Sequence, residues 1–463
     1  MTDPIDWAAA TEEVVAMLRD LIRIPSVNPP GVEDGAAGRD SIGAETAAAR
    51  YCADVLDGAG IDSELVEVAP GRASCFARLS ASGPNPQPPL ILLGHLDVVP
   101  VQADAWSHDP FGGELIDGVV WGRGAVDMKD MVAMELGVML ALKRSGAELR
   151  RDLIFAAVAD EEAGGMAGAQ ALVRSHPRLF SSPDGAQAAA AINEVGGYSM
   201  TLAGRRFYTI QVAEKGIMWS RVHAEGSPGH GSMPHEDNAV VHLAAAVARL
   251  AADPRPARVH PVVGEFFDAI GLAEVARLAP GDPAAARAAL ETGVDDPVLR
   301  RSFDAMLRDT VSPTVLRGGN KVNVIPGRAG AEIDVRTLPG TDQAELLQHL
   351  RSVAGPRASV ETVASLPPVV APADHELVTL MRDALRRADP EGTPVPMMIT
   401  PGTDAKALAE LGIPTYGFAP LRLDPEVPFL SLFHGHDERV PVAALRFGLP
   451  VLHEVVARYA LHA

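Results

Sequence analysis

Histidine and acidic residues gather at four places in the chain, and their spacing is regular. The four clusters are Gly94–Asp97, Gly124–Asp127, Asp160–Glu162 and Asn193–Glu194. Taking His95, Asp127, Glu162 and Glu194 as their representatives, the separations are 32, 35 and 32 residues. A strand–helix–strand step takes about 30 residues, so this spacing can return the chain to one edge of a parallel sheet each time. Ligands of open α/β sheets bind at that carboxyl edge.

An imidazole and several carboxylates that meet at one point need a cation to balance their charge. This donor set, without cysteine, suits zinc, with manganese and cobalt as alternatives. Each cluster alone has an ordinary structural explanation. A lone histidine such as His95 is typically a hydrogen-bonded core residue, and Asp160–Glu162 has the composition of an acidic first helical turn. The regular spacing of all four clusters favours a metal site.

The segments that must position these clusters have the pattern of a parallel α/β domain. Short apolar runs predict buried strands at Leu90–Leu93, Leu153–Ala159 and Ala188–Asn193. Helices are predicted from a cap at Asp6 to Ile22, from about Gly43 to Asp57, over Met128–Lys143 and over His375–Arg387. Asp117-Gly118 between two short apolar stretches predicts a hairpin, and Ile413–Phe418 a last strand.

A different pattern begins near Tyr208 and predicts a second module. Strand-like segments occur at Tyr208–Val212, Ile217–His223 and Ala331–Arg336, and helical ones at Asn238–Ala251 and Gln343–Val353. This pattern favours an antiparallel sheet with helices on it. The Ala- and Pro-rich segment 253–310 is predicted to be helical, without an assigned role. We therefore predict one domain from residues 1–212 and 373–463, interrupted by a second domain at 213–372.

The motifs around the four clusters resemble those of a known enzyme family. Leu93–Pro100, Trp121–Asp130, Ala159–Gly165 and Asn193-Glu194 are similar to the dinuclear zinc family of acetylornithine deacetylase, succinyl-diaminopimelate desuccinylase, aminoacylase and carboxypeptidase G. The similarity continues, in the family's order, through Lys215-Gly216, His230–His235, Lys321–Gly340, Gly402–Asp404 and His434–Val440. The resemblance implies an α/β catalytic domain with a mostly parallel central sheet flanked by helices. It also implies an inserted α+β lid and dimerisation domain with an antiparallel sheet.

The resemblance also implies a metal-ligand set and a general base. The implied ligands of two zinc ions, for which cobalt or manganese are alternatives, are His95, Asp127, Glu162, Glu194 and His434. Asp127 would bridge the ions, His95 and Glu194 would complete one site, and Glu162 and His434 the other. His436 lies two residues from His434, and only the phase of the motif selects His434. Asp97 resembles the carboxylate that orients a ligand imidazole, and Glu161 matches the general base.

Substrate contacts follow from the same resemblance. His230 resembles the lid histidine that stabilises the oxyanion, in many members from the neighbouring subunit of a dimer. Arg336 resembles the arginine that binds the substrate carboxylate, and Asn323, Gly402 and Thr403 resemble further contacts. Gly402 and Thr403 precede a predicted helix, Asp404–Leu411, whose first amides could bind a carboxylate. Without the surrounding motifs, His230 would be explained as a turn histidine, Arg336 as a partner in a structural salt bridge and Asn323 as a turn-stabilising amide.

The activity implied is zinc-dependent hydrolysis of an amide bond in a small N-acyl amino acid or short peptide. Glu194, rather than aspartate, is typical of the deacylase and carboxypeptidase branches, and the dipeptidase or aminopeptidase branch stays an alternative. A non-catalytic metal-dependent binding protein is disfavoured because Glu161 and all five ligands are present. The chain has no Gly-x-Ser-x-Gly elbow and no P-loop.

Composition bounds the remaining possibilities. The 463 residues include 60 acidic and 40 basic side chains, a net charge of −20, which disfavours nucleic acids and anionic membranes as partners. With 47% hydrophobic and 22% charged residues, a packed globular protein is expected. Met1–Ala10 lacks the pattern of a signal peptide, and no apolar run reaches about 18 residues. The only cysteines, Cys52 and Cys75, suit a reducing compartment. We expect a cytoplasmic homodimer that associates through the inserted domain.

Overall fold

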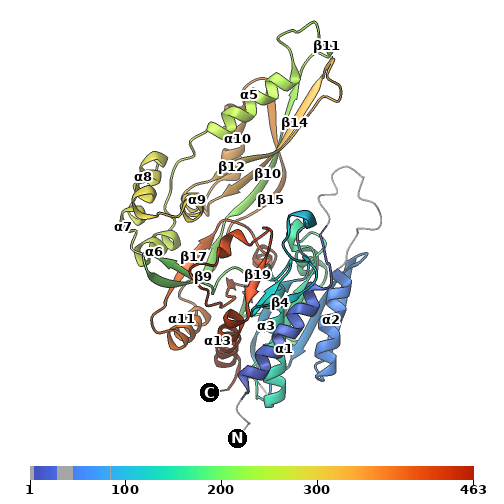
Figure 1. Ribbon diagram of the computed structural model, residues 1–463, viewed down its shortest axis with the longest axis vertical. Coiled ribbons are helices and arrows are strands. Elements are labelled where there is room, and N and C mark those ends of the chain that lie inside the picture. The colour runs from blue at the N-terminus through green and yellow to red at the C-terminus, as the bar shows by residue number, and fades with distance from the viewer. Residues whose placement is uncertain (1–4, 29–44, 84, 463) are drawn as a thin grey trace. The chain divides into compact units, whose positions relative to one another are not determined.

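The computed structural model describes residues 5–28, 45–83 and 85–462, and these fall into two compact units (Figure 1). The first unit contains the chain up to Val212, Ala371–Met397 and the chain from Thr403 onward. The second contains Ala213–Val370 and Met398–Gly402, so it interrupts the first. Its assignment as a lid and dimerisation domain stays a prediction. Residues 43 and 44, at the predicted start of the second helix, lie outside the described residues.

The first unit is built on a mixed sheet whose centre is parallel. In spatial order its strands are β1 (Ser63–Ala69), β2 (Arg72–Leu79), β6 (Arg151–Val158), β3 (Gln87–His95), β7 (Ala190–Asn193), β18 (Thr415–Gly417) and β9 (Arg205–Glu214). β6, β3, β7 and β18 run parallel, whereas the outer strands pair antiparallel. Strands β8 (Ser199–Leu202), β16 (Val369–Val370) and β17 (Thr393–Ile399) pair with β9. The predicted α/β class with a mostly parallel central sheet is confirmed.

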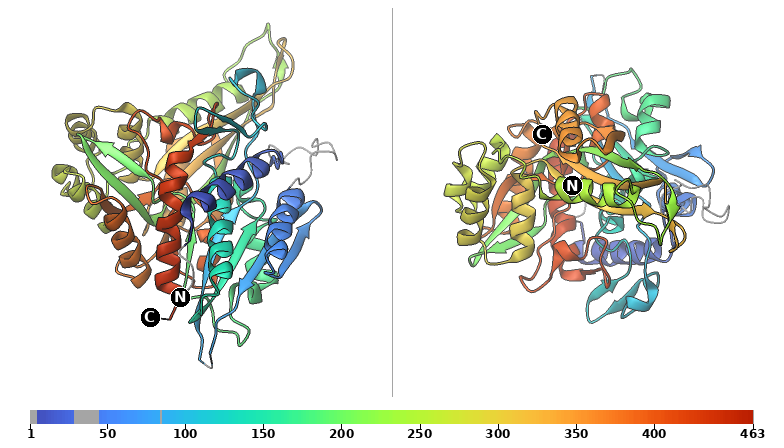
Figure 2. Two further views of the ribbon diagram at one scale, coloured as in Figure 1. Left: turned by 60° about the horizontal axis from the view of Figure 1, so that its bottom comes forward. Right: turned by 90° about the horizontal axis from the view of Figure 1, so that it is seen from above.

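Helices cover both faces of this sheet. They are α1 (Trp7–Ile22), α2 (Glu45–Gly58), α3 (Lys129–Ser145), α4 (Ala169–Ser175), α11 (Glu376–Ala388), α12 (Ala405–Glu410) and α13 (Val442–Ala460). α1, α3 and α13 pack side by side, as the views of Figures 1 and 2 show. α4 and α12 pack on the opposite face in a core with Leu172, Leu408 and Ile91.

The sequence explains where the first of these helices begins and why α3 is buried. The Asp6 side chain accepts hydrogen bonds from the amides of Ala8 and Ala9, which caps α1. α3 is apolar almost all round and ends at Gly146, whose φ of +61° suits glycine. α3 lies so close to β3 that a Cβ on Gly94 would be 2.8 Å from a Val132 methyl carbon.

The second unit has its own sheet and core. An antiparallel sheet has the order β12 (Thr310–Gly318), β14 (Arg328–Thr337), β10 (Gly216–Glu225) and β15 (Ala358–Leu366). α5 (Ala239–Ala252) and α10 (Gln343–Ala354) cover one face, with Leu243 and Leu346 in the shared core. The short strands β11 (Gly229–His230) and β13 (Val324–Ile325) form a separate pair.

Two details differ from the sequence expectations or complete them. The pattern changes at Tyr208, within the predicted first domain of residues 1–212, and Tyr208–Val212 lies in β9 and pairs within the large sheet of the first unit. The segment 253–310 is largely helical, with α6 (Pro261–Ala269), α7 (Ala273–Ala276), α8 (Pro283–Gly293) and α9 (Pro297–Met306).

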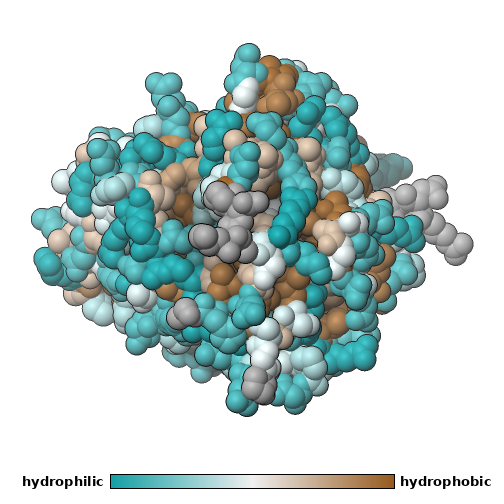
Figure 3. Space-filling view, turned by 90° about the horizontal axis from the view of Figure 1, so that it is seen from below, coloured by the Kyte–Doolittle hydropathy of each residue, from teal (hydrophilic) through white to brown (hydrophobic). Residues whose placement is uncertain are grey.

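On the face drawn in Figure 3, hydrophilic side chains predominate and apolar ones appear in smaller groups between them. Among the helices that the structure describes, none combines the length and the apolar character needed to cross a bilayer.

Candidate metal centre

Parallel strand ends bring most of the predicted ligands together. His95 ends β3, Glu162 lies in a single 3₁₀ turn, η3 (Glu161–Ala163), just after β6, and Glu194 follows β7. Because β6, β3 and β7 are parallel neighbours, these three residues lie at one edge of the sheet. Asp127 reaches that edge by a different route from the predicted strand–helix step. It follows the hairpin of β4 (Glu114–Ile116) and β5 (Val119–Trp121) and precedes α3.

Five side chains form two groups that share Asp127. In the first group, His95 Nε2 lies 3.2 Å from Asp127 Oδ1 and 3.6 Å from Glu194 Oε2. In the second, His434 Nε2 lies 3.2 Å from Asp127 Oδ2 and 3.0 Å from Glu162 Oε2. In each group the potential ligand atoms all lie within 4.8 Å of one another. One imidazole and two carboxylates around one point can hold a divalent cation.

The protonation of His95 fits a ligand role. Its Nδ1 lies 2.9 Å from the backbone carbonyl of Asp97, which can only accept a hydrogen bond. In the neutral ring the proton is therefore on Nδ1, and the Nε2 lone pair faces Asp127 and Glu194. The Asp97 carboxylate is farther away, with Oδ1 3.6 Å from Nδ1, so the backbone of Asp97 fixes this ring more closely than its side chain does.

The electrostatics of the site also fit a cation. Burial and the neighbouring Asp127 raise the pKa of Glu162 to about 7. Hydrogen bonds to Asp127 and Glu162 raise the pKa of His434 to about 10. Both shifts favour the protonated forms of these groups without a metal, and binding of a divalent cation would release protons. Glu162 Oε1 is buried and has no hydrogen-bond partner among the described residues.

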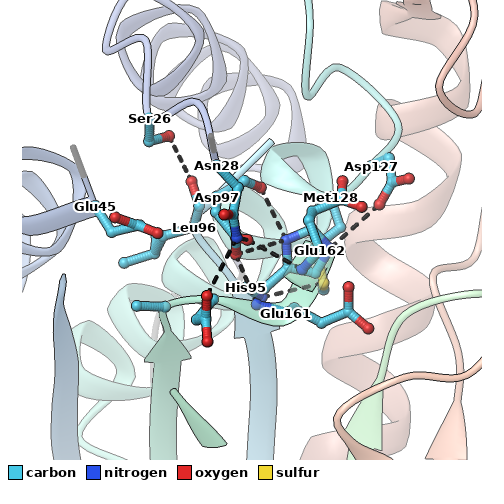
Figure 4. A network of polar contacts seen from close by, with 12 residues as sticks. Ser26, Asn28, Glu45, His95, Leu96, Asp97, Asp127, Met128, Glu161 and Glu162 are labelled. Carbon is cyan, nitrogen blue, oxygen red and sulfur yellow. Dashed lines mark hydrogen bonds and ion pairs between the residues drawn. The ribbon is translucent and has the colours of Figure 1, made fainter. Parts of the chain in front are cut away.

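Asp97 and Glu438 hold the loops that carry the acidic groups. Asp97 Oδ1 and Oδ2 accept hydrogen bonds from the backbone amides of Glu161 and Glu162, each at 3.0 Å (Figure 4). Glu438 Oε1 accepts from the amides of Val126 at 2.8 Å and Asp127 at 3.1 Å. Glu438 was not singled out from the sequence. It is buried four residues beyond His434, and that proximity to a candidate ligand was its only sequence signal.

His230 and Asn323 come together in the second unit. The β11–β13 pair places His230 opposite Val324, and the amide of Gly231 donates to the carbonyl of Asn323 at 2.8 Å. His230 Nδ1 accepts from the amide of Ser232 at 3.2 Å, and the Ser232 hydroxyl lies 2.7 Å from the same nitrogen. Since an amide only donates, the proton of the neutral His230 ring is on Nε2, which makes Nε2 a hydrogen-bond donor.

Arg336 lies on β14, on the face of the four-stranded sheet away from α5 and α10. Its Nε donates to Asp334 Oδ1 at 2.8 Å, and both side chains are partly exposed. The boundary between the two units falls between Gly402 and Thr403. Thr403 is buried, and its hydroxyl accepts from the amide of Ala405 at 3.1 Å. α12 is shorter than predicted, because only Ala405–Glu410 is helical and Thr403 already binds its first amide.

Comparison with known proteins identifies the family. The family model described as peptidase family M20/M25/M40 matches residues 91–458. The chain belongs to this family. Human aminoacylase-1 is 29% identical over 443 residues, covering 94% of this chain and 93% of that protein. Mouse N-fatty-acyl-amino acid synthase/hydrolase PM20D1 is 29% identical over 384 residues, covering 79% and 72%. The dipeptidase Dug1p of Saccharomyces cerevisiae shares the fold, with a TM-score of 0.71 at 14% identity over 98% of both chains.

Membership of the M20/M25/M40 family makes this protein a metal-dependent hydrolase of amide bonds. The two groups around Asp127 supply donor sets that fit the metal. The sequence motifs do not include every residue at the site, because Asn28 and Arg72, two residues outside them, contact Asp97 and Asp160. No local pattern distinguishes Asn28 and Arg72 in the sequence.

Proposed function

We propose that this protein hydrolyses the amide bond of an N-acyl amino acid or short peptide that carries a carboxylate next to the cleaved bond. We further propose that two zinc ions, for which cobalt or manganese are alternatives, occupy the two groups around Asp127. The observation that carries the proposal is that Asp127 offers one oxygen to each imidazole–carboxylate pair, and that Glu161 directly precedes Glu162, a member of the second pair. Similarity to human aminoacylase-1 over nearly the whole of both chains supports the deacylase branch.

Glu161 is the proposed general base. Divalent ions held by the two groups would supply Lewis acidity, which polarises a substrate carbonyl and lowers the pKa of water. The Glu161 carboxylate takes the proton of the attacking water and delivers it to the nitrogen of the leaving amine. The backbone amides of Glu161 and Glu162 are both held by Asp97, so the base and its neighbouring ligand are fixed by one carboxylate.

The second unit supplies most of the proposed substrate contacts, and Thr403 belongs to the first unit. His230 donates a hydrogen bond from Nε2 to the oxyanion, a direction that its contact with Ser232 favours. Arg336 Nε donates a hydrogen bond to Asp334, and its two terminal nitrogens can donate two parallel hydrogen bonds to a substrate carboxylate. Asn323, Gly402 and Thr403 are proposed as further contacts.

We also propose a homodimer formed through the second unit. Strand β12 is an edge of the four-stranded sheet and carries the exposed Val315 and Leu316. Helix α5 packs beside β12 and exposes Val240 and Val241. An edge strand next to exposed apolar side chains is a surface that a second copy can cover. Sedimentation velocity would report a dimer for the unmodified protein and a monomer for Leu316→Glu; a monomer in both cases would refute the proposal.

Primary-amine release from a substrate panel tests the activity. The panel contains N-acetyl and N-succinyl amino acids, peptides with a C-terminal glutamate, and free dipeptides, each with added zinc or cobalt and with a chelator as control. Metal-dependent release from the acylated or C-terminal substrates would support the proposal. Release from free dipeptides alone would place the protein in the dipeptidase branch, and no release with two metals bound would refute the proposed activity.

A further inference from the structure

The Asp97 carboxylate is fully buried and holds three hydrogen-bond donors. Two are the backbone amides of Glu161 and Glu162, as described above. The third is the side-chain amide of Asn28, whose Nδ2 donates to Asp97 Oδ2 at 2.7 Å (Figure 4). Any rotation of this carboxylate would release the turn that carries both acidic side chains, so Asn28 helps to fix that turn through Asp97.

Arg72 determines which way the Asn28 amide faces. Arg72 Nη2 donates to Asn28 Oδ1 at 3.1 Å. A guanidinium has donors only, so the carbonyl oxygen of Asn28 must face Arg72. Nδ2 is then directed at Asp97 and at Asp160 Oδ1, the latter at 3.3 Å. If the amide were reversed, the Asn28 oxygen would face the carboxylates of Asp97 and Asp160. Its nitrogen would then face the Arg72 guanidinium.

Arg72 also holds the start of the turn directly. Its Nη1 donates to Asp160 Oδ1 and, at 3.1 Å, to Glu45 Oε1. Asp160 immediately precedes Glu161, has a φ of +69°, and accepts the amide of Ala167 at 2.6 Å through Oδ2. The Arg72 side chain is only 9% exposed, so its planar fork of donors joins buried groups from several segments.

We infer that Asn28 and Arg72 are positioning residues for the catalytic turn at Glu161 and Glu162. Arg72 holds Asp160 at the beginning of the turn and orients Asn28, and Asn28 fixes the Asp97 carboxylate that binds the two turn amides. The inference rests on the proposed function, in which Glu161 is the general base and Glu162 a metal ligand. Neither residue belongs to the motifs that define the site in the sequence.

Hydrogen exchange of the metal-free protein tests the network without any activity. In Asn28→Asp, which keeps the shape and removes the donor, the peptide covering residues 160–163 should exchange about tenfold faster or more. Arg72→Lys keeps the charge but loses the fork, and should change exchange in the same direction. Ser26→Ala is the matched control: the Ser26 hydroxyl donates to the Leu96 carbonyl at 2.5 Å from the same segment, but does not contact the Asp97 carboxylate.

Steady-state kinetics then separate positioning from general stability. At saturating zinc, Asn28→Asp should lower kcat about 10- to 100-fold with KM within about threefold of the unmodified value. Ser26→Ala should keep kcat within about twofold at a temperature where both variants are fully folded. If Asn28→Asp does not fold, Asn28→Ala replaces it, because alanine removes the donor without adding a carboxylate.

Two results would overturn the inference. One is exchange at residues 160–163 in the Asn28 variants that equals the exchange in Ser26→Ala. The other is a fall in kcat that disappears after correction for the folded, metal-loaded fraction. Failure of the proposed function is distinguishable, because it would be seen as an unmodified protein that is inactive on the amide panel, whereas the exchange result judges the network in either case.

Discussion

The contact between Ser232 and His230 predicts how strongly two substitutions reduce turnover. His230→Ala removes the proposed oxyanion donor, a loss that typically lowers kcat about 10²- to 10³-fold. Ser232→Ala removes only the hydroxyl 2.7 Å from Nδ1, and the backbone amide at 3.2 Å still fixes the tautomer. One neutral hydrogen bond contributes about 0.5–1.5 kcal/mol, so Ser232→Ala should lower kcat about 2- to 12-fold.

The assay is steady-state hydrolysis of the best substrate of the panel, with kcat and KM measured separately. Both substitutions should act mainly on kcat, because the oxyanion exists only in the transition state. His235→Ala is the matched control from the same segment and should stay within about twofold of the unmodified protein. An unchanged kcat in His230→Ala would refute the role of His230. A loss in Ser232→Ala as large as in His230→Ala would refute the argument from the hydrogen bond to Nδ1.

Three further predictions concern the base, the metal and acid stability. Glu161→Gln should still bind two metal equivalents in equilibrium dialysis but lose about 10²- to 10⁴-fold in kcat; normal turnover would contradict the assignment. Chelation should abolish activity. It should also lower the free energy of unfolding of the first unit by about 4 kcal/mol, relative to protein at a free zinc concentration about 1,000 times Kd. An unchanged urea midpoint would show that these groups bind no metal. Burial lowers the pKa of His453 to about 4, so its contribution to stability is present above the unfolded value of about 6.5 and is lost as the pH falls toward 4. Urea unfolding should therefore show a loss of about 2 kcal/mol between about pH 7.5 and about pH 5 that is absent in His453→Phe, and equal losses in both proteins would exclude His453 as its source.

Local pattern was enough to predict the elements that carry most of the site. The apolar runs at Leu90–Leu93 and Leu153–Ala159 match the buried parts of β3 and β6. His95 is the last residue of β3, and Glu162 lies in the turn shortly after β6. The route of Asp127 was beyond that pattern. Its loop is held by Glu438 and by the pairing of β5 with β19 (Arg439–Pro441), contacts that no local periodicity records.

The residues that the sequence analysis missed have distant partners. Asn28 is 69 residues from Asp97, and Arg72 is 88 residues from Asp160. Neither has a neighbouring motif. A buried arginine or asparagine needs hydrogen-bond partners, and here the fold brings those partners from distant parts of the sequence. Ligands at strand ends have both a local strand pattern and a regular spacing, whereas the residues that support them have neither.

The segment from His434 to Glu438 links the second metal group to the folding of the first unit. His434 shares Asp127 with the rest of the site, and four residues later Glu438 binds the Asp127 amide across a sequence separation of 311 residues. Contacts from the C-terminal part of this unit therefore hold Asp127 in its place between the two groups. His95 and Glu194 depend instead on adjacent parallel strands. Loosening the segment from His434 to Glu438 should thus weaken metal binding at Glu162 and His434 more than at His95 and Glu194. Binding at Glu162 and His434 would then include the free-energy cost of ordering this segment.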